Sequence, residues 1–237
     1  MFGFFIKKYL ESKGFVLLTK DQVEDNKKKS SYNYYIESQR YLEATEFRYV
    51  LWLDRIYQKI KNVPGHVVEL GVAYGRNSIL FGHQIKMNGD ELVRKYYGFD
   101  TFSGYTQESL KLEPNLSDAT WKDKSKGWVE DKIKRVGLDE LCFLTEGDVV
   151  KTVPDFLEKK PNFRAALLYV DCNSYIPSIE GMRAMKNFMS PGGVICIDEK
   201  RQGGETKALI EFCKENNLRF MKDDSPFAIP SYTQFEY

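Results

Sequence analysis

The chain has 237 residues, of which 42% are hydrophobic, 14% aromatic and 29% charged, and its 35 basic and 34 acidic residues give a formal charge of +1. The apolar content suffices for a folded core and argues against a disordered chain. The near-neutral charge lacks the basic footprint of a nucleic-acid-binding protein. No window approaches the ~18 consecutive apolar residues of a membrane-spanning helix. At roughly 150 residues per domain, the length fits one large domain, alone or with an extension.

The few cysteines and histidines restrict the available chemistry. The four cysteines form no C-x-x-C pair, which argues against a zinc site or a thioredoxin-like site. Cys142 and Cys196 lie in apolar runs and are expected in the core. The N-terminus has neither the basic region nor the long apolar stretch of a signal peptide, so we expect a cytoplasmic protein.

The N-terminal quarter has helical patterns. Residues 1–20 alternate apolar and basic side chains, which predicts a short helix packed on its own domain, on a partner or on a membrane surface. Between Glu37 and Lys61, apolar residues recur at helical spacing and predict one or two helices. We therefore expect an N-terminal helical extension over residues 1–62.

From residue 63 onward, strand and helix patterns alternate. Short apolar runs predict strands at residues 66–71, 95–100, 142–146, 165–171 and 193–198, with two terminal strands at 218–221 and 232–237. Helical spacing follows at residues 77–87, 177–189 and 206–216. Nearly all-apolar strands alternating with helices predict an α/β, Rossmann-like domain over residues 63–237, with a mostly parallel seven-stranded sheet and helices on both faces.

The polar segment 102–135 interrupts this alternation. Long connections in compact domains are typically lids or binding loops, so we expect a lid here. The segment carries Trp121 and Trp128, which either stack on a sugar or anchor the segment to the domain.

Acidic residues stand at the ends of the predicted strands. Parallel sheets bind ligands at their carboxyl edge, so acids in register there predict a shared site, although Asp is also a common turn and N-cap residue. The acids concerned are Glu69, Asp100, Asp148, Asp171, Asp198 and Glu199.

The turn after the first strand reads Glu69-Leu-Gly-Val-Ala-Tyr-Gly75. It departs from the dinucleotide fingerprint G-x-G-x-x-G, because Ala73 and Arg76 replace the second and third glycines, and no Gly-Lys-Ser/Thr follows for a phosphate-binding Walker loop. The pattern E-x-G-x-x-x-G resembles motif I of class I S-adenosylmethionine-dependent methyltransferases.

Further strings sharpen this resemblance. The strings Gly-Phe-Asp-Thr-Phe-Ser-Gly (98–104), Gly-Asp (147–148), Leu-Tyr-Val-Asp-Cys-Asn-Ser-Tyr (168–175) and Ser-Pro-Gly-Gly-Val-Ile-Cys-Ile-Asp-Glu (190–199) follow in order. Together they resemble the TylF/MycF family of sugar O-methyltransferases over roughly residues 40–237, and the first 35 residues lie outside the resemblance.

The resemblance implies a role for each matching residue. S-adenosylmethionine would lie against the turn formed by Gly71, Ala73, Tyr74 and Gly75, with Glu69 and Ser78 beside it; Asp100 would bind the ribose and Asp148 would lie by the adenine. Asp171, Asp198 and Glu199 would hold Mg²⁺, for which carboxylate oxygens are suitable ligands. The implied activity is methylation of a sugar hydroxyl on a glycan or glycosylated metabolite, in a protein that forms homo-oligomers through its N-terminal helices.

The sequence departs from the family at the reaction site. Asn173 stands where the family has its candidate catalytic Asp, and Glu199 stands where Asp is usual. Three interpretations stay open: the metal suffices with water as proton acceptor, another residue such as Glu199 or His83 is the base, or the protein binds cofactor with weakened or lost catalysis. A nucleotide-sugar or nicotinamide enzyme on the same kind of sheet is a further alternative, and Arg76 counts against the nicotinamide version.

Overall fold

The computed structural model describes residues 44–117, 121–122, 124–197, 203–222 and 231–234. Residues 48–237 form one compact unit, distinct from residues 1–47, and this unit contains every described strand. The helix predicted over residues 1–20 lies outside the described residues. No helix in the described ranges is long and apolar enough to cross a membrane.

The fold is built on one sheet in the strand order β3-β2-β1-β4-β5-β7-β6. Strands β1 to β5 are parallel, whereas β7 runs antiparallel to both β5 and β6. The prediction of a mostly parallel sheet is thus confirmed, with a parallel part of five strands. The strands are β1 (His66–Leu70), β2 (Tyr96–Asp100), β3 (Cys142–Glu146), β4 (Ala165–Val170), β5 (Met189–Ile197), β6 (Met221–Lys222) and β7 (Ser231–Gln234).

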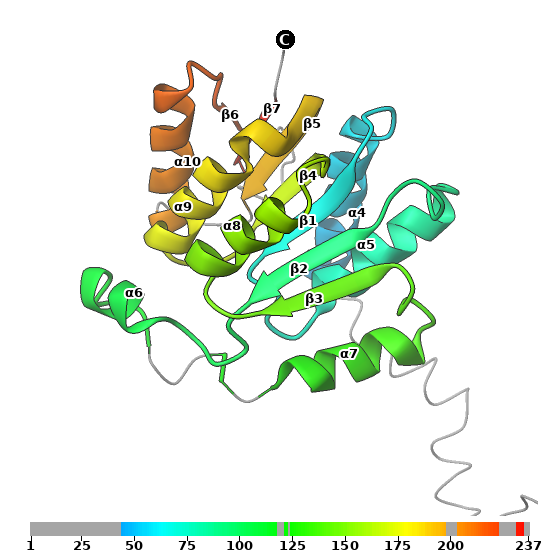
Figure 1. Ribbon diagram of the computed structural model, residues 1–237, viewed down its shortest axis with the longest axis horizontal. Coiled ribbons are helices and arrows are strands. Elements are labelled where there is room, and N and C mark those ends of the chain that lie inside the picture. Colours follow the sequence, from blue (N-terminus) through cyan, green and yellow to red (C-terminus); the bar gives the residue numbers. More distant parts are fainter. Residues whose placement is uncertain (1–43, 118–120, 123, 198–202, 223–230, 235–237) are drawn as a thin grey trace, which may run out of the picture. The chain divides into compact units, whose positions relative to one another are not determined.

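Helices cover both faces of the sheet, as predicted (Figure 1). Every residue of central strand β4 is buried, because alternate side chains enter cores on opposite faces. One core joins the sheet to α4 (Ala44–Lys59), α5 (Arg76–Met87) and α7 (Lys126–Arg135). The other joins it to α8 (Val149–Lys159), α9 (Tyr175–Met185) and α10 (Gly204–Glu215). Both Cys142 and Cys196 are buried, as expected.

Helix α4 belongs to the sheet domain rather than to a separate extension. Its residues Trp52, Leu53, Ile56 and Tyr57 are fully buried in the core shared with α5 and α7. The compact unit consequently begins at Arg48, upstream of the predicted boundary after residue 62.

The described part of segment 102–135 has more regular secondary structure than the long connection that we expected. It contains α6 (Gln107–Leu112) and α7, and α7 buries Val129 and Ile133 against the sheet as an ordinary crossover helix between β2 and β3. Ser125 caps α7 by accepting a hydrogen bond from the Trp128 N–H. Among the described residues of the segment, Gly104, Tyr105, Thr106, Ser109 and Trp121 line the pocket described below.

Several element boundaries differ from the prediction, and three of them have a local explanation. Helix α9 begins at Tyr175, because Pro177 is tolerated in a first turn whose N–H groups need no helical partner. Strand β5 begins at Met189 and includes the Ser-Pro-Gly-Gly string, with a register shift against β4. The Leu218 N–H bonds the Cys213 carbonyl at the end of α10, so β6 begins only at Met221.

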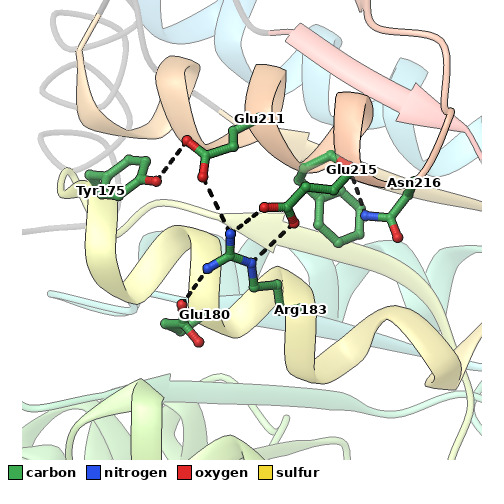
Figure 2. A network of polar contacts seen from close by, with 7 residues as sticks. Tyr175, Glu180, Arg183, Glu211, Glu215 and Asn216 are labelled. Atoms are coloured by element: carbon green, nitrogen blue, oxygen red, sulfur yellow. Dashed lines mark hydrogen bonds and ion pairs between the residues drawn. The ribbon is translucent and has the colours of Figure 1, made fainter.

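A network centred on Arg183 joins α9 to α10 (Figure 2). The Arg183 guanidinium donates to Glu180 at 2.6 Å, to Glu211 at 3.3 Å and to Glu215. Glu211 in turn accepts from the Tyr175 hydroxyl at 2.8 Å. The hydrogen bond from Arg183 lowers the pKa of the Glu215 carboxyl.

We expect Arg183→Met to lower the midpoint of thermal unfolding at pH 7 by no more than about 4 °C, because exposed ion pairs contribute little. A carboxyl whose folded pKa is lowered stabilises the protein above its unfolded pKa and loses that contribution as the pH falls through the folded pKa. The difference between Arg183→Met and wild type should therefore shrink as the pH falls below the usual Glu pKa of about 4.3. Scanning calorimetry across pH 3–8 measures the difference in unfolding midpoint between the two proteins. An equal difference at pH 3 and pH 8 would contradict a stabilising Arg183–Glu215 ion pair.

Candidate active site

A pocket opens at the carboxyl edge of the sheet, where the chain leaves β1, β2, β3 and β4. The strand order reverses direction between β1 and β4, and open α/β sheets bind ligands at such a point. The empty volume of the pocket, including its open mouth, is about 650 Å³. The lining residues are Gly71, Ala73, Asp100, Thr101, Gly104, Tyr105, Thr106, Ser109, Trp121, Asp148, Val149, Asp171, Cys172, Asn173 and Pro177.

The turn after β1 forms one wall of the pocket. Gly71 has φ +88°, and a Cβ there would lie 2.0 Å from the backbone oxygen of Asp171, so only glycine allows β1 and β4 to approach this closely. Ala73 at φ +46° and Gly75 at φ +72° continue the turn in left-handed conformations. Successive backbone N–H groups in such a turn form a concave, polar surface.

Asp100 ties the turns after β1 and β2 together. One carboxylate oxygen, Oδ2, accepts the N–H groups of Val72 at 2.7 Å and Ala73 at 2.8 Å. The other, Oδ1, accepts the Phe102 N–H at 2.6 Å. Phe102 itself has φ +50°, so the carboxylate holds a strained turn in place. Asp100 therefore shapes the pocket in addition to lining it.

Two further acids reach the pocket from β3 and β4. Asp148 caps α8, where its Oδ1 accepts the Val150 N–H at 3.0 Å. Asp171 follows β4, and its Oδ1 accepts a hydrogen bond from Asn173 Nδ2 at 3.1 Å. The predicted partners Asp198 and Glu199 lie outside the described residues. Three of the predicted strand-end acids, Asp100, Asp148 and Asp171, thus line one pocket.

Comparison with known proteins decides the family. Residues 68–199, more than half of the chain, match the family model described as a methyltransferase domain. The chain belongs to this family. We accordingly describe it as an S-adenosylmethionine-dependent methyltransferase. A search of curated proteins gave no match.

Solved structures share the fold of the methyltransferase. It is similar to the calicheamicin methyltransferase CalS11, with 21% identity, a TM-score of 0.74, and coverage of 94% of this chain and 96% of CalS11. It is also similar to the O-methyltransferase NovP, with 19% identity, a TM-score of 0.67 and coverage of 80% of each chain. At these identities, the likeness establishes the fold.

Four of the predicted cofactor residues are outside the pocket lining: Glu69, Tyr74, Gly75 and Ser78. The Glu69 side chain is fully buried on the α5 face of the sheet, where it accepts hydrogen bonds from Asn77 at 2.7 Å and from the Tyr96 hydroxyl. Ser78 donates to the same Tyr96 hydroxyl at 2.9 Å. Both residues brace the start of α5 beneath the turn that lines the pocket. His83, on α5, is also outside the pocket lining.

Aromatic side chains gather at the pocket mouth of the methyltransferase. Trp121 lines the pocket, donates from Nε1 to the Tyr105 hydroxyl at 3.2 Å and packs on Tyr74 at a centroid distance of 5.4 Å. Trp128 packs edge-on against Tyr74 at a centroid distance of 6.4 Å, with the Lys132 ammonium 4.7 Å from its ring. Of the two tryptophans, Trp121 lines the pocket and is placed to touch a ligand, whereas Trp128 is outside the lining and 41% exposed.

Several residues around the Asp171 turn could not be recognised as functional from the sequence pattern. Glu113, after α6, accepts the Ser174 hydroxyl at 2.6 Å and the Tyr175 N–H at 2.7 Å, and so caps α9 from outside. Glu205, on α10, is fully buried and accepts the Asn173 N–H. Both acids lie in polar stretches of sequence, for which we would expect solvent-exposed side chains. Their partners are remote in sequence, and only the fold brings them together.

Neither the thiol nor the phenol that lines the pocket ionises readily. Burial, assisted by Glu205, Asp100 and Asp171, raises the pKa of the Cys172 thiol well above its usual value. Burial likewise raises the pKa of Tyr105. Because only a thiolate is a strong nucleophile, Cys172 is unsuited to covalent catalysis at neutral pH.

Proposed function

We propose that this methyltransferase transfers a methyl group from S-adenosylmethionine to a hydroxyl of a sugar, on a glycan or glycosylated metabolite, with Mg²⁺ assistance. The observation that carries the proposal is a pocket lined by two sets of residues. Gly71, Ala73, Asp100 and Asp148 form the first set, and Asp171, Asn173, Tyr105 and Trp121 form the second.

The first set of residues suits the cofactor. The turn at Gly71 offers a cradle that a side chain at that position would fill, and left-handed Ala73 lines the pocket beside it. A carboxylate has about four acceptor positions. Three backbone N–H groups occupy three of those of Asp100, and a ribose hydroxyl would take the fourth in place of the long 3.5 Å contact from the Thr101 hydroxyl. Asp148 also lines the pocket, and we assign it to the adenine. S-adenosylmethionine supplies a methyl group already activated by its sulfonium.

The second set of residues suits a sugar hydroxyl. The Asn173 amide orients the Asp171 carboxylate. This carboxylate accepts a hydrogen bond from the sugar hydroxyl and so directs the hydroxyl oxygen toward the methyl carbon of the cofactor. Such positioning contributes ~7–11 kcal/mol in the best cases. Trp121 offers an aromatic face for the sugar ring. Because an amide cannot take a proton, Asn173 does not replace the family base, and we assign the proton to water.

The magnesium part of the proposal has partial support. Asp171 is one carboxylate of the suitable kind, but no group of three metal-ligating side chains occurs within the described residues. Asp198 and Glu199 complete the expected set and lie outside those residues. A bound Mg²⁺ would lower the pKa of the acceptor hydroxyl.

Structural relatives favour a sugar acceptor. A second CalS11 structure is described as a TDP-rhamnose 3′-O-methyltransferase, with 21% identity to this chain, a TM-score of 0.68, and coverage of 94% of this chain and 98% of that one. Asn173 motivates a second candidate function: a protein that binds S-adenosylmethionine with weakened or lost catalysis.

The test is transfer of a labelled methyl group to nucleoside diphosphate sugars and simple glycosides, with a catechol as the non-sugar control. We expect label on a sugar, loss of transfer in EDTA and recovery with Mg²⁺. Label on the catechol alone would overturn the sugar assignment, and transfer unaffected by EDTA would remove the metal. Cofactor binding with no transfer to any acceptor would favour the second candidate function.

A further inference from the structure

Glu205 connects the interior of the protein to the floor of the pocket. Its side chain is fully buried in the first turn of α10, and its Oε1 accepts the backbone N–H of Asn173. Burying a carboxylate is costly unless hydrogen bonds compensate it, so a buried acid at this point calls for a role. Glu205 does not line the pocket, but Asn173 does.

The residue that Glu205 holds has a strained backbone. Asn173 has φ +52°, a left-handed conformation that non-glycine residues keep only when their surroundings enforce it. The same residue uses its side-chain amide to contact Asp171 Oδ1 at 3.1 Å. The contacts thus run from Glu205 through Asn173 to the Asp171 carboxylate.

Close packing fixes the start of α10 against this turn. A Cβ on Gly204 would lie 2.5 Å from the Tyr175 nitrogen and 3.0 Å from the Ser174 carbonyl carbon. The backbone before Glu205 therefore cannot shift toward the turn, and the Glu205 carboxylate has a defined position. The Glu205 carboxyl also lies close enough to two lining groups to contribute to the raised pKa values of Cys172 and Tyr105.

We propose that Glu205 is a positioning residue for the part of the site assigned to the sugar hydroxyl. Glu205 holds the turn after β4 so that Asn173 directs the Asp171 carboxylate into the pocket. The proposal rests on the proposed function and deepens it. It accounts for Asn173 as a residue that orients Asp171, and it assigns that orientation to an acid on a different helix.

The test compares Glu205→Ala, which removes the acceptor, with Glu205→Gln, whose carbonyl oxygen still accepts the Asn173 N–H. We expect Glu205→Ala to lower kcat by about 10- to 100-fold, since small misplacements at a reacting centre have effects of this size. The KM for S-adenosylmethionine should stay within about threefold, because Asp100 and Gly71 are untouched. Glu205→Gln should restore most of kcat. Glu215→Gln, at an exposed acid of the same helix that pairs with Arg183, is the matched control.

A readout independent of activity is hydrogen exchange of the Asn173 amide, measured by NMR. Protection should fall in Glu205→Ala and persist in Glu205→Gln and Glu215→Gln. Unchanged protection in Glu205→Ala, or lost protection with wild-type kcat, would overturn the proposal. If wild type transfers no methyl group, the proposed function fails, while the exchange data still decide whether Glu205 holds the turn.

A second variant covers the case in which Glu205→Ala does not fold. Asn173→Gly suits the left-handed backbone and removes only the amide that contacts Asp171. It should reproduce the loss in kcat with an unchanged KM for S-adenosylmethionine, and adding Glu205→Gln should cause no further loss. Wild-type kcat in Asn173→Gly would overturn the proposal.

Discussion

Gly71→Ala should lower the free energy of unfolding by about 3–5 kcal/mol, among the largest effects expected of a single substitution. The new Cβ would lie 2.0 Å from the Asp171 carbonyl oxygen and 2.5 Å from its carbon. These are backbone atoms, and the Asp171 N–H is itself bonded to the Leu70 oxygen at 2.7 Å, so β1 and β4 must separate. Because the pocket lies between these strand ends, binding of S-adenosylhomocysteine should weaken at least tenfold.

Gly89→Ala is the matched control for backbone strain. Gly89 has φ +72°, and nothing lies within 4 Å of the position its Cβ would take. Its cost is therefore the left-handed strain alone, about 1–2 kcal/mol. Thermal and denaturant unfolding of both variants measures the difference. Equal losses of stability in the two variants, or unchanged binding of S-adenosylhomocysteine to Gly71→Ala, would show that the close approach of β1 and β4 is unimportant.

Asp100→Ala should weaken binding of S-adenosylhomocysteine about 100-fold, equivalent to about 2.8 kcal/mol. The substitution removes the acceptor of three backbone N–H groups, at Val72, Ala73 and Phe102, and with it the order of two pocket walls. Hydrogen bonds to charged groups contribute about 1.5–3 kcal/mol each, part of which water recovers at a half-open site. We therefore also expect a loss of about 2–4 kcal/mol in stability.

Two further variants separate the roles of Asp100. Asp100→Asn keeps one acceptor oxygen and should give intermediate losses in binding and stability. Asp155→Ala removes an exposed acid from α8 and should change neither quantity. If Asp100→Ala lost stability but bound S-adenosylhomocysteine as wild type does, Asp100 would be a structural residue only.

Much of the sheet follows from local sequence. The runs that form β1, β2 and β4 are short, apolar and bounded by turn residues, so strand type and parallel topology were predictable. The convergence of Asp100, Asp148 and Asp171 follows from that topology, because parallel strands end at one edge. Helix α7 was missed because only Val129 and Ile133 mark its buried face.

Side-chain partners depend on tertiary structure and were less predictable. Glu69 lies within β1, so its side chain faces α5 rather than the sheet edge; strand alternation contained this information. Glu113 and Glu205 carry no such signal. Their hydrogen bonds come from packing against a turn more than 30 residues away in sequence. The hydrogen bonds of Asp100 to the neighbouring turn likewise need the register of β1 against β2.

The most direct test of the cofactor pocket is calorimetric titration of S-adenosylhomocysteine into wild type and Asp100→Ala, with NAD titrated in parallel. We predict saturable binding of one S-adenosylhomocysteine per wild-type chain, about 100-fold weaker binding to Asp100→Ala, and no binding of NAD. Tight NAD binding without S-adenosylhomocysteine binding, or equal affinity of the two proteins for S-adenosylhomocysteine, would contradict the pocket assignment.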